Sequence, residues 1–328
     1  MIKIIAEIGS VHDGSFGNAL NLIDAAAESG ADAVKFQTHI AEAESVASAP
    51  APSYFSAEPR LAYFKRTAFT IDQWKALAGH AAVKGVTFLS SPFSLEAVDL
   101  LEELGISAYK IPSGEVSNIP LLLRIAKTGK PVLLSSGMSS WDELDLAVAT
   151  VKISCATTVM QCSSAYPCPP ERVGLNVLQE MSRRYGLPIG YSDHTMGVAA
   201  PIAAAAFGAT VIEKHFTFSR QMYGSDAKHS MEPSEFKKMA CALREVWAML
   251  DNPVVKSDIT PYTEMKRIFE KSIVAARALT IGETIAPEML AFKKPGDGIP
   301  AREYSRLIGR TMVRSLDGDE QIREADFK

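Results

Sequence analysis

Two short segments of the sequence end in clusters of ionisable residues that include a histidine. The segment GYSDH ends at His194, and the segment VIEKH ends at His215. Each is part of an apolar stretch typical of a short buried strand. If the two strands are parallel neighbours, the imidazoles can converge on one divalent cation, because neutral imidazole is a common metal ligand. The alternative is that both histidines are only hydrogen-bonded at strand ends.

The elements that must position these histidines form a repeating pattern. Short runs rich in β-branched residues alternate with longer runs of helical periodicity. The runs predicted as strands are 2–8, 33–37, 86–90, 108–112, 131–136, 158–163, 188–192 and 210–215. This count and length predict an α/β fold of the (β/α)8 TIM barrel type. An open doubly wound sheet is the alternative, but EIGSVHDGS after the first strand is not a glycine-rich phosphate loop.

The character of the chain changes after the predicted barrel. We assign residues 1–252 to the catalytic barrel and the polar, proline-bearing residues 253–269 to a linker. Residues 270–328 contain short apolar runs separated by turn signals and are predicted to form a small β-rich domain. A domain of this size is close to the lower limit for independent folding, so we expect it to rest against another surface.

The composition of the chain indicates which kinds of partner and which cellular compartment are expected. The net charge is -4 and basic residues are not clustered, which argues against nucleic acid or an anionic membrane as a partner. The four cysteines form no CxxC pair, and the N-terminus has no signal-peptide pattern, so a cytoplasmic protein with reduced thiols is expected. The apolar run 197–212 is too short to span a membrane and contains a proline. We expect small molecules and further copies of this chain as partners.

The carboxyl ends of the predicted strands are rich in reactive residue types, and in a (β/α)8 barrel this is where the active site lies. Lys35 and Lys110, with nearby hydroxyl groups and turn amides, can hold the phosphate and carboxylate of an anionic three-carbon substrate. A Lewis-acidic metal can polarise an aldehyde, while Glu213, Asp13 or Asp226 places water or moves a proton. This combination predicts carbon–carbon bond formation on a sugar aldehyde.

Nine motifs, taken in order, resemble the sialic acid synthase family: AEIGSVHDGS, AVKFQTH, YKIPSGE, LLSSGMSS, QCSSAYPCPP, GYSDHT, EKHFT, DAKHSMEP and KKPGDGI. The likeness covers nearly the whole chain. It implies an enzyme that condenses phosphoenolpyruvate with an N-acetylated hexosamine, typically N-acetylmannosamine, to give a nine-carbon 2-keto acid and phosphate. It also implies that the C-terminal domain is an antifreeze-like (SAF) domain that caps the partner's active site in a domain-swapped homodimer.

The resemblance implies roles for individual residues. The metal, Mn²⁺ or Mg²⁺, is expected on His194 and His215. The residues expected to hold phosphoenolpyruvate are Lys35, Gln37, Lys110, Ser113, Ser135, Ser164 and Ser192. Those with catalytic roles around the sugar are Asp13, Tyr166, Glu213 and Asp226, and the further sugar contacts are Glu115 and Lys294.

Four positions depart from the family pattern. Val11 and Asp13 stand in VHDG where relatives commonly read NHEG, and Ser164 stands where many carry asparagine. Lys294 replaces the arginine of an expected Arg-Pro-Gly, so it offers a point charge instead of a planar fork. These changes suggest an acceptor other than N-acetylmannosamine, for example the 2,4-diacetamido-trideoxyhexoses of legionaminate- or pseudaminate-type synthases.

Two further functions stay open as alternatives. A pyruvate aldolase would use Lys35 or Lys110 as a Schiff base. A non-catalytic sugar-binding protein would have kept the barrel and the cap without turnover. Segment 39–68, with Tyr54, Phe55, Tyr63 and Phe64, is predicted as a long loop on the catalytic side that forms an acceptor wall or a dimer contact.

Overall fold

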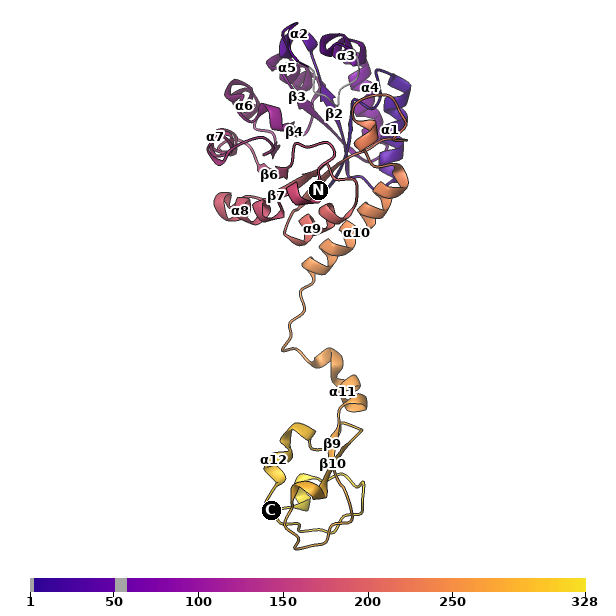
Figure 1. Cartoon of the computed structure of the whole chain (residues 1–328), viewed down its shortest axis with the longest axis vertical. Helices are drawn as coiled ribbons and strands as arrows, with labels where there is room; N and C mark the ends of the chain where they lie inside the picture. The colour runs from indigo at the N-terminus through magenta and orange to yellow at the C-terminus, as the bar shows by residue number, and fades with distance from the viewer. Residues whose placement is uncertain (1–2, 51–57) are drawn as a thin grey trace. The chain divides into compact units, whose positions relative to one another are not determined.

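Eight parallel strands close into a barrel in the N-terminal part of the chain (Figure 1). The computed structural model describes residues 3–50 and 58–328. In the barrel each strand pairs with the next one along the chain, and β8 closes on β1. The strands are β1 Ile4–Gly9, β2 Ala33–Thr38, β3 Thr87–Pro92, β4 Tyr109–Ile111, β5 Val132–Ser135, β6 Thr157–Cys162, β7 Ile189–Asp193 and β8 Val211–His215. The predicted (β/α)8 barrel is confirmed.

Helices follow the strands and cover the outside of the barrel (Figure 1). Several begin where the sequence supplies a cap: Ser15 accepts from the third residue after it, and Thr70 and Ser140 each form a capping box. The helices are α1 Phe16–Glu28, α2 Ala41–Glu44, α3 Arg60–Thr67, α4 Ile71–Val83, α5 Leu95–Leu104, α6 Ile119–Ala126, α7 Trp141–Lys152, α8 Leu175–Tyr185, α9 Ala199–Ala206 and α10 Pro233–Asp251.

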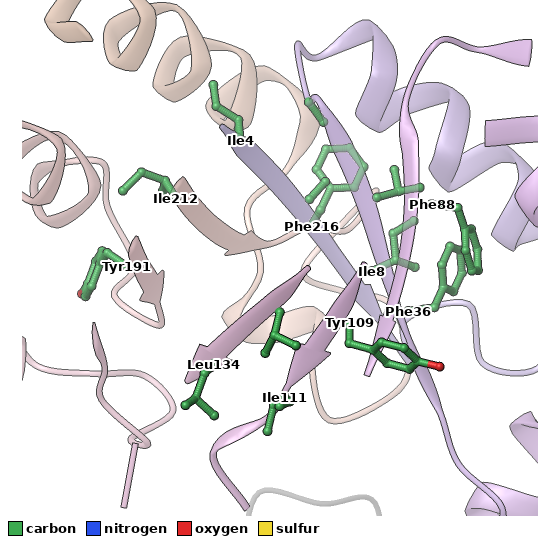
Figure 2. Close-up of a cluster of buried hydrophobic side chains, with 14 of the residues drawn as sticks. Ile4, Ile8, Phe36, Phe88, Tyr109, Ile111, Leu134, Tyr191, Ile212 and Phe216 are labelled. Carbon is green, nitrogen blue, oxygen red and sulfur yellow. The ribbon is translucent and has the colours of Figure 1, made fainter. Parts of the chain in front are cut away.

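Alternation along the strands separates two buried layers. Outward side chains such as Ile4, Phe36 and Tyr109 pack with the helices in one large core, part of which is drawn in Figure 2. A smaller cluster fills the barrel interior with one apolar residue from most strands, including Ile5, Leu89 and others. Because side chains alternate along a strand, the residues two and four positions after each of these apolar residues also point into the barrel. These later positions lie nearer the carboxyl end of the strand.

Segment 39–68 is not the long loop predicted from the sequence. It contains α2 directly after β2 and α3 just before α4, and Tyr63 and Phe64 on α3 are buried. Tyr54 and Phe55 lie outside the described residues. Tyr63 and Phe64 form a small buried cluster with Ala41 of α2, and Leu61, one turn before Phe64, packs against it.

The C-terminal residues form a second compact unit, Pro253–Lys328. It begins with an extended segment and α11 Thr263–Phe269, followed by the antiparallel pair β9 Ser272–Ala275 and β10 Leu290–Lys293 and the short α12 Tyr304–Leu307. Ile273, Leu279, Leu307 and Ile322 are among the residues of its own small core. None of the helices in the described residues is long and apolar enough to cross a membrane.

Candidate active site

A cavity of about 270 Å³ opens at the carboxyl ends of the barrel strands. The inward-facing residues of the strand ends line it, as expected for a barrel of this type. Among them are these residues singled out in the sequence: Lys35, Gln37, Lys110, Ser113, Ser135, Ser164, Tyr166, Ser192, His194, Glu213, His215 and Asp226. Elements as far apart as β2 and the loop after β8 therefore bring most of the predicted site residues to one place.

Two buried lysines and a buried glutamate form the charged centre of the cavity. Glu213 Oε1 lies 3.4 Å from Lys110 Nζ, and its Oε2 lies 3.9 Å from Lys35 Nζ. Ser192, the register partner of Glu213 on β7, donates to Glu213 Oε1 at 2.9 Å. Lys110 also donates to Ser135 Oγ at 2.6 Å. The two lysines thus lie on either oxygen of the Glu213 carboxylate, and the hydroxyl groups of Ser135 and Ser192 lie within hydrogen-bond distance of this charged group.

Glu7 is a fourth charged member of this centre, and the sequence analysis did not select it. It is the register neighbour of Lys35 and of His215, and Lys35 Nζ lies 2.8 Å from Glu7 Oε2. Gln37 Nε2 donates to its other oxygen at 2.7 Å. The sequence did contain a signal for Glu7, since it is the one charged residue in the apolar run IIAEIG. Burying an unpaired charge is costly, so a charged residue there is expected to have a charged partner.

The two carboxylates of the centre have opposite electrostatic environments. Burial raises the pKa of Glu213, but the charges of Lys110 and Lys35 outweigh burial and bring the pKa down to about 2. Burial also raises the pKa of Glu7, and there Lys35 offsets it only partly, so the pKa is about 7. Burial acts to lower the pKa of Lys35, but the negative charges of Glu213 and Glu7 outweigh burial, so the pKa is raised overall. Two carboxyl groups with separated pKa values can divide charge stabilisation and proton transfer between them.

His194 and His215 lie side by side at the ends of β7 and β8. Their ring centres are 5.4 Å apart, and the ring of Tyr166 lies 4.1 Å from that of His194. His194 Nδ1 donates to the Ser163 carbonyl at 2.7 Å, which in the neutral ring leaves Nε2 as the lone-pair nitrogen. Burial lowers the pKa of His215 to about 4, so the ring is neutral at pH 7.

The two imidazoles fit a divalent cation as a pair of protein ligands. His215 Nδ1 is buried and has no hydrogen-bond partner in the part of the chain that the structure describes. The described residues contain no group of three or more histidine, cysteine, aspartate or glutamate side chains placed to hold a metal. A cation at His194 and His215 would therefore take its other ligands from substrate and water, an arrangement typical of catalytic sites.

Two glycines leave room for hydroxyl and carboxylate groups at the cavity edge. A Cβ on Gly137 would lie 2.4 Å from Ser164 Oγ and 2.5 Å from Ser113 Oγ. A Cβ on Gly9, which has φ +54°, would lie 2.6 Å from Asp226 Oδ2. Both glycines are thus required for the present positions of these groups.

Two residues predicted for the site, Asp13 and Glu115, do not line this cavity. Asp13 does not line the cavity: Arg66 Nη2 donates to its Oδ1 at 2.9 Å, on a turn where Asp13 has φ 50°. Glu115 is not among the lining residues and accepts from Asn118 Nδ2 at 2.7 Å. Lys294 belongs to the second unit, where its Nζ lies 5.0 Å from the ring centre of Phe269.

An ion pair on the outer face of the barrel supports the two histidines. Lys214 contacts Asp193 Oδ2 and the Thr195 carbonyl, and both ion-pair side chains are at most 1% exposed. Tyr191 Oη donates to Asp193 Oδ1 at 2.8 Å, and the Thr195 amide donates to it at 3.0 Å. Asp193 and Lys214 each directly precede a candidate metal ligand, so their pairing ties the ends of β7 and β8 together.

Comparison with known proteins places these features in a family. A model of the NeuB family matches residues 22–254, and a model of the SAF domain matches residues 270–328. N,N'-diacetyllegionaminic acid synthase of Campylobacter jejuni is 37% identical over 98% of both chains. Human N-acetylneuraminate-9-phosphate synthase is 34% identical over 98% of this chain and 91% of its own.

A solved structure is similar as well. The N-acetylneuraminic acid synthetase of Leptospira borgpetersenii serovar Hardjo-bovis, determined with citrate, has a TM-score of 0.73 and 31% identity. The similarity covers 81% of this chain and 90% of that one. The likeness therefore includes the arrangement in space as well as the order of motifs.

Proposed function

Because the chain belongs to the NeuB family, we propose that it condenses phosphoenolpyruvate with an N-acetylated hexosamine and water, giving a nine-carbon 2-keto sugar acid and phosphate. Its relatives include proteins named as synthases of legionaminic acid, pseudaminic acid and N-acetylneuraminate 9-phosphate. The observation that carries the proposal is the buried centre of Lys35, Lys110 and Glu213 beside two histidines at the strand ends.

The charged centre suits an anionic donor. Lys35 and Lys110 carry two positive charges and Glu213 carries one negative charge, so the centre has one net positive charge when Glu7 is protonated, below about pH 7. The phosphate and carboxylate of phosphoenolpyruvate would be bound by these lysines and by neighbouring hydroxyl groups through charge-assisted hydrogen bonds. Ser113, Ser135 and Ser164 line the same part of the cavity.

The acceptor aldehyde is assigned to the side of the cavity that holds the histidines. His194 and His215 would hold Mn²⁺ or Mg²⁺, which when bound would polarise the aldehyde oxygen. Glu7 is the group we assign to donate a proton to that oxygen as the donor's C3 attacks the carbonyl carbon, because its pKa of about 7 keeps a proton available near neutral pH. Water then adds at C2 of the donor and gives a proton to the Glu7 carboxylate, and the C2–O bond to phosphate breaks as the new C2 hydroxyl passes its proton to the leaving phosphate and becomes the keto group.

Glu213 has a different role in this scheme. Its pKa of about 2 keeps it ionised, so it orients Lys110 and Lys35 and stabilises positive charge that develops on the donor carbon. Asp226 accepts from the Ser10 amide and hydroxyl at 3.3 and 3.2 Å and lines the cavity. We assign it to a hydroxyl group of the sugar.

The second unit is proposed to act on a partner copy. Side chains of the connecting segment, such as Val254, Ile259, Met265 and Phe269, are more than half exposed, which is unusual for large apolar groups so close in sequence. A domain-swapped homodimer would cover them and would bring Lys294 to the cavity of the other copy. This assembly is a proposal from the resemblance and from these exposures.

Phosphate release tests the reaction. Purified protein is given phosphoenolpyruvate and Mn²⁺ with N-acetylmannosamine, its 6-phosphate or a 2,4-diacetamido-2,4,6-trideoxyhexose, each with and without EDTA. We expect release that needs an acceptor and stops with chelator. Release with no acceptor dependence, or silence across the panel in a folded protein, would contradict the proposal.

A pyruvate aldolase with a Schiff-base lysine is the second candidate. Lys35, with its raised pKa, is held protonated among carboxylates, and a protonated amine is a poor nucleophile. Borohydride treatment with pyruvate and sugar should therefore leave the mass of the chain unchanged. A trapped adduct at Lys35 or Lys110 would favour the aldolase.

A further inference from the structure

A glutamine and a histidine extend the charged centre along one side of the cavity. Gln37 Nε2 donates to Glu7 Oε1 at 2.7 Å, and Gln37 Oε1 lies 3.1 Å from His39 Nε2. His39 Nδ1 in turn lies 2.8 Å from Glu44 Oε2. We call these four hydrogen-bonded side chains the Gln37–His39 network. Glu7, Gln37 and His39 line the cavity, and the Glu44 side chain is only 3% exposed.

The direction of these hydrogen bonds follows from the chemistry of the groups. The Gln37 amide nitrogen faces Glu7, so the amide oxygen faces His39. That oxygen can only accept, and the bond therefore requires a proton on His39 Nε2. At the other ring nitrogen, a proton shared between Nδ1 and the carboxylate of Glu44 joins the ring to a buried anchor.

Stacking holds the His39 ring in the plane that these bonds require. The ring lies between Phe64 and Phe93, with ring centres 3.8 and 4.2 Å away and 19° and 17° between the planes. Both ring faces are therefore covered, and the nitrogens at the ring edge contact Gln37 and Glu44. A half-turn of the Gln37 amide would place its N–H groups against the His39 N–H and cost the network a hydrogen bond.

The fixed amide determines where the proton of Glu7 can go. Lys35 Nζ lies 2.8 Å from Glu7 Oε2, so both carboxyl oxygens face nitrogen donors. Neither an ammonium nor an amide nitrogen accepts a proton, and the proton of a neutral Glu7 therefore stays available to a ligand in the cavity. If the Gln37 amide were turned, its oxygen would accept that proton and hold it away from the ligand.

We propose that His39 is a positioning residue for the reaction: its Nε2–H fixes the Gln37 amide so that the proton of Glu7 stays directed at the acceptor aldehyde. This inference rests on the proposed function, in which Glu7 gives its proton to the aldehyde oxygen. His39 acts only through Gln37 and has no contact with the reacting atoms. Other charged or titratable groups near the two ends of the network include Lys35, Glu213, Arg60 and His12.

Nuclear magnetic resonance of the histidine ring nitrogens tests the network without substrate. The full chain is labelled with ¹⁵N-histidine, and the His39 signals are assigned through their bonds to the backbone. We expect His39 Nε2 to be protonated. A lone pair on Nε2 would overturn the proposal, because the Gln37 amide would then have to present its nitrogen to the ring. This measurement uses the unaltered protein, so it decides even if a His39 variant fails to fold.

His39→Phe keeps the stacked ring and removes both nitrogens. The Gln37 amide can then turn, so kcat for phosphate release should fall about five- to tenfold, with KM for phosphoenolpyruvate within about twofold. A role in stacking alone would leave kcat unchanged, and full kcat in a folded His39→Phe would overturn the proposal. His80→Phe is the matched control: His80 of α4 lies beside Asp24 of α1 on the outside of the barrel, and its loss should change neither quantity.

A double-variant cycle tests whether His39 acts through Gln37. Gln37→Leu removes the amide, so His39→Phe should lower kcat no further in that background. A second loss of about five- to tenfold would show that His39 acts by another route and would overturn the proposal.

The outcomes separate this inference from the proposed function. Absence of phosphate release with every acceptor would contradict the synthase, and the nitrogen spectrum would still decide whether His39 holds the Gln37 amide. Phosphate release together with a lone pair on His39 Nε2 would leave the synthase intact and overturn the role of His39.

Discussion

Glu213 and Lys214 are neighbours in the sequence, but they belong to two ion-pair clusters with opposite properties. Glu213 points into the barrel, where its oxygens lie 3.4 and 3.9 Å from two lysines and where the cavity gives access. Lys214 points out of the barrel and is enclosed with Asp193, Tyr191 and Thr195. The alternation of one strand therefore separates a group that can bind a ligand from a group that cannot.

The difference shows how the barrel uses buried charge. The outer pair is tight and every carboxylate oxygen of Asp193 has hydrogen-bond donors, which is the condition under which a buried ion pair is tolerated. The inner group is looser, has an excess of cation and includes Glu7, whose pKa is about 7. The outer ion pair of Lys214 and Asp193 links the ends of β7 and β8. The inner group of Lys35, Lys110 and Glu213 remains accessible to a substrate.

The largest expected effect comes from breaking the outer pair. Lys214→Met leaves Asp193 buried without its cation and should lower the free energy of unfolding by about 3–5 kcal/mol. Urea unfolding followed by tryptophan fluorescence measures it. Lys130→Met is the matched control, because the Lys130–Glu102 pair is partly exposed and should cost less than about 1 kcal/mol. Equal losses in both variants would remove the distinction between the two clusters.

Breaking the inner group should affect turnover instead of stability. Lys110→Met removes one donor to the substrate anion and should lower kcat/KM for phosphoenolpyruvate about 10²–10³-fold. The melting temperature should stay the same or rise, because a cluster with excess positive charge loses one charge. Phosphate release and thermal unfolding on the same preparation test this; a folded Lys110→Met with full activity would contradict the assignment.

Glu7→Gln tests the proton at the inner group. If protonated Glu7 is the acid, kcat/KM of the unaltered protein should fall as pH rises through about 7, and the variant should lack this limb and be about 10²-fold slower. The charged groups that face Glu7 are Lys35 and Glu213. The measurement is kcat/KM for phosphate release as a function of pH in both proteins. If the variant shows the same decrease above about pH 7 as the unaltered protein, Glu7 is not the general acid.

The same shift has a consequence for stability. The pKa of Glu7 is raised on folding, so its stabilising contribution is complete below the ordinary pKa of a glutamate and is lost as pH rises through about 7. Glu7→Gln should flatten the pH dependence of unfolding over that window.

The smallest effect is expected at Ser164. Its Oγ is buried and has no hydrogen-bond partner among the described residues, so Ser164→Ala should leave stability within about 0.5 kcal/mol. If that hydroxyl binds phosphoenolpyruvate, KM for the donor should rise about three- to tenfold, as loss of one hydrogen bond implies. Initial rates at varied donor concentration measure it, and an unchanged KM would remove Ser164 from the donor site.

Much of the site was predictable because of the fold's regularity. All strands of a parallel barrel end on the same side, so Lys35, Lys110 and Glu213 could be grouped without knowing any contact. Asp13 also follows a strand, yet a left-handed turn and Arg66 hold it away from the cavity. The position of a residue after a strand predicts that it lies at the carboxyl-terminal end of the barrel. It does not predict whether a side chain in the following loop points into the cavity.

Two residues show where prediction from the sequence ends. Glu7 is hidden in an apolar run, and its importance depends on the register that places it beside Lys35. Arg60 lies in a segment predicted as a loop, but it begins α3 and lines the cavity.

The barrel, the change of character after its last helix and the order of the strand-end motifs could all be predicted from the sequence, because these depend on local periodicity and on composition. The tertiary structure alone shows which lysine pairs with which carboxylate, which of two adjacent charges is enclosed, and that residues of α3 line the cavity. Those outcomes depend on strand register and on the paths of long connections, and both are set by contacts between residues far apart in the chain.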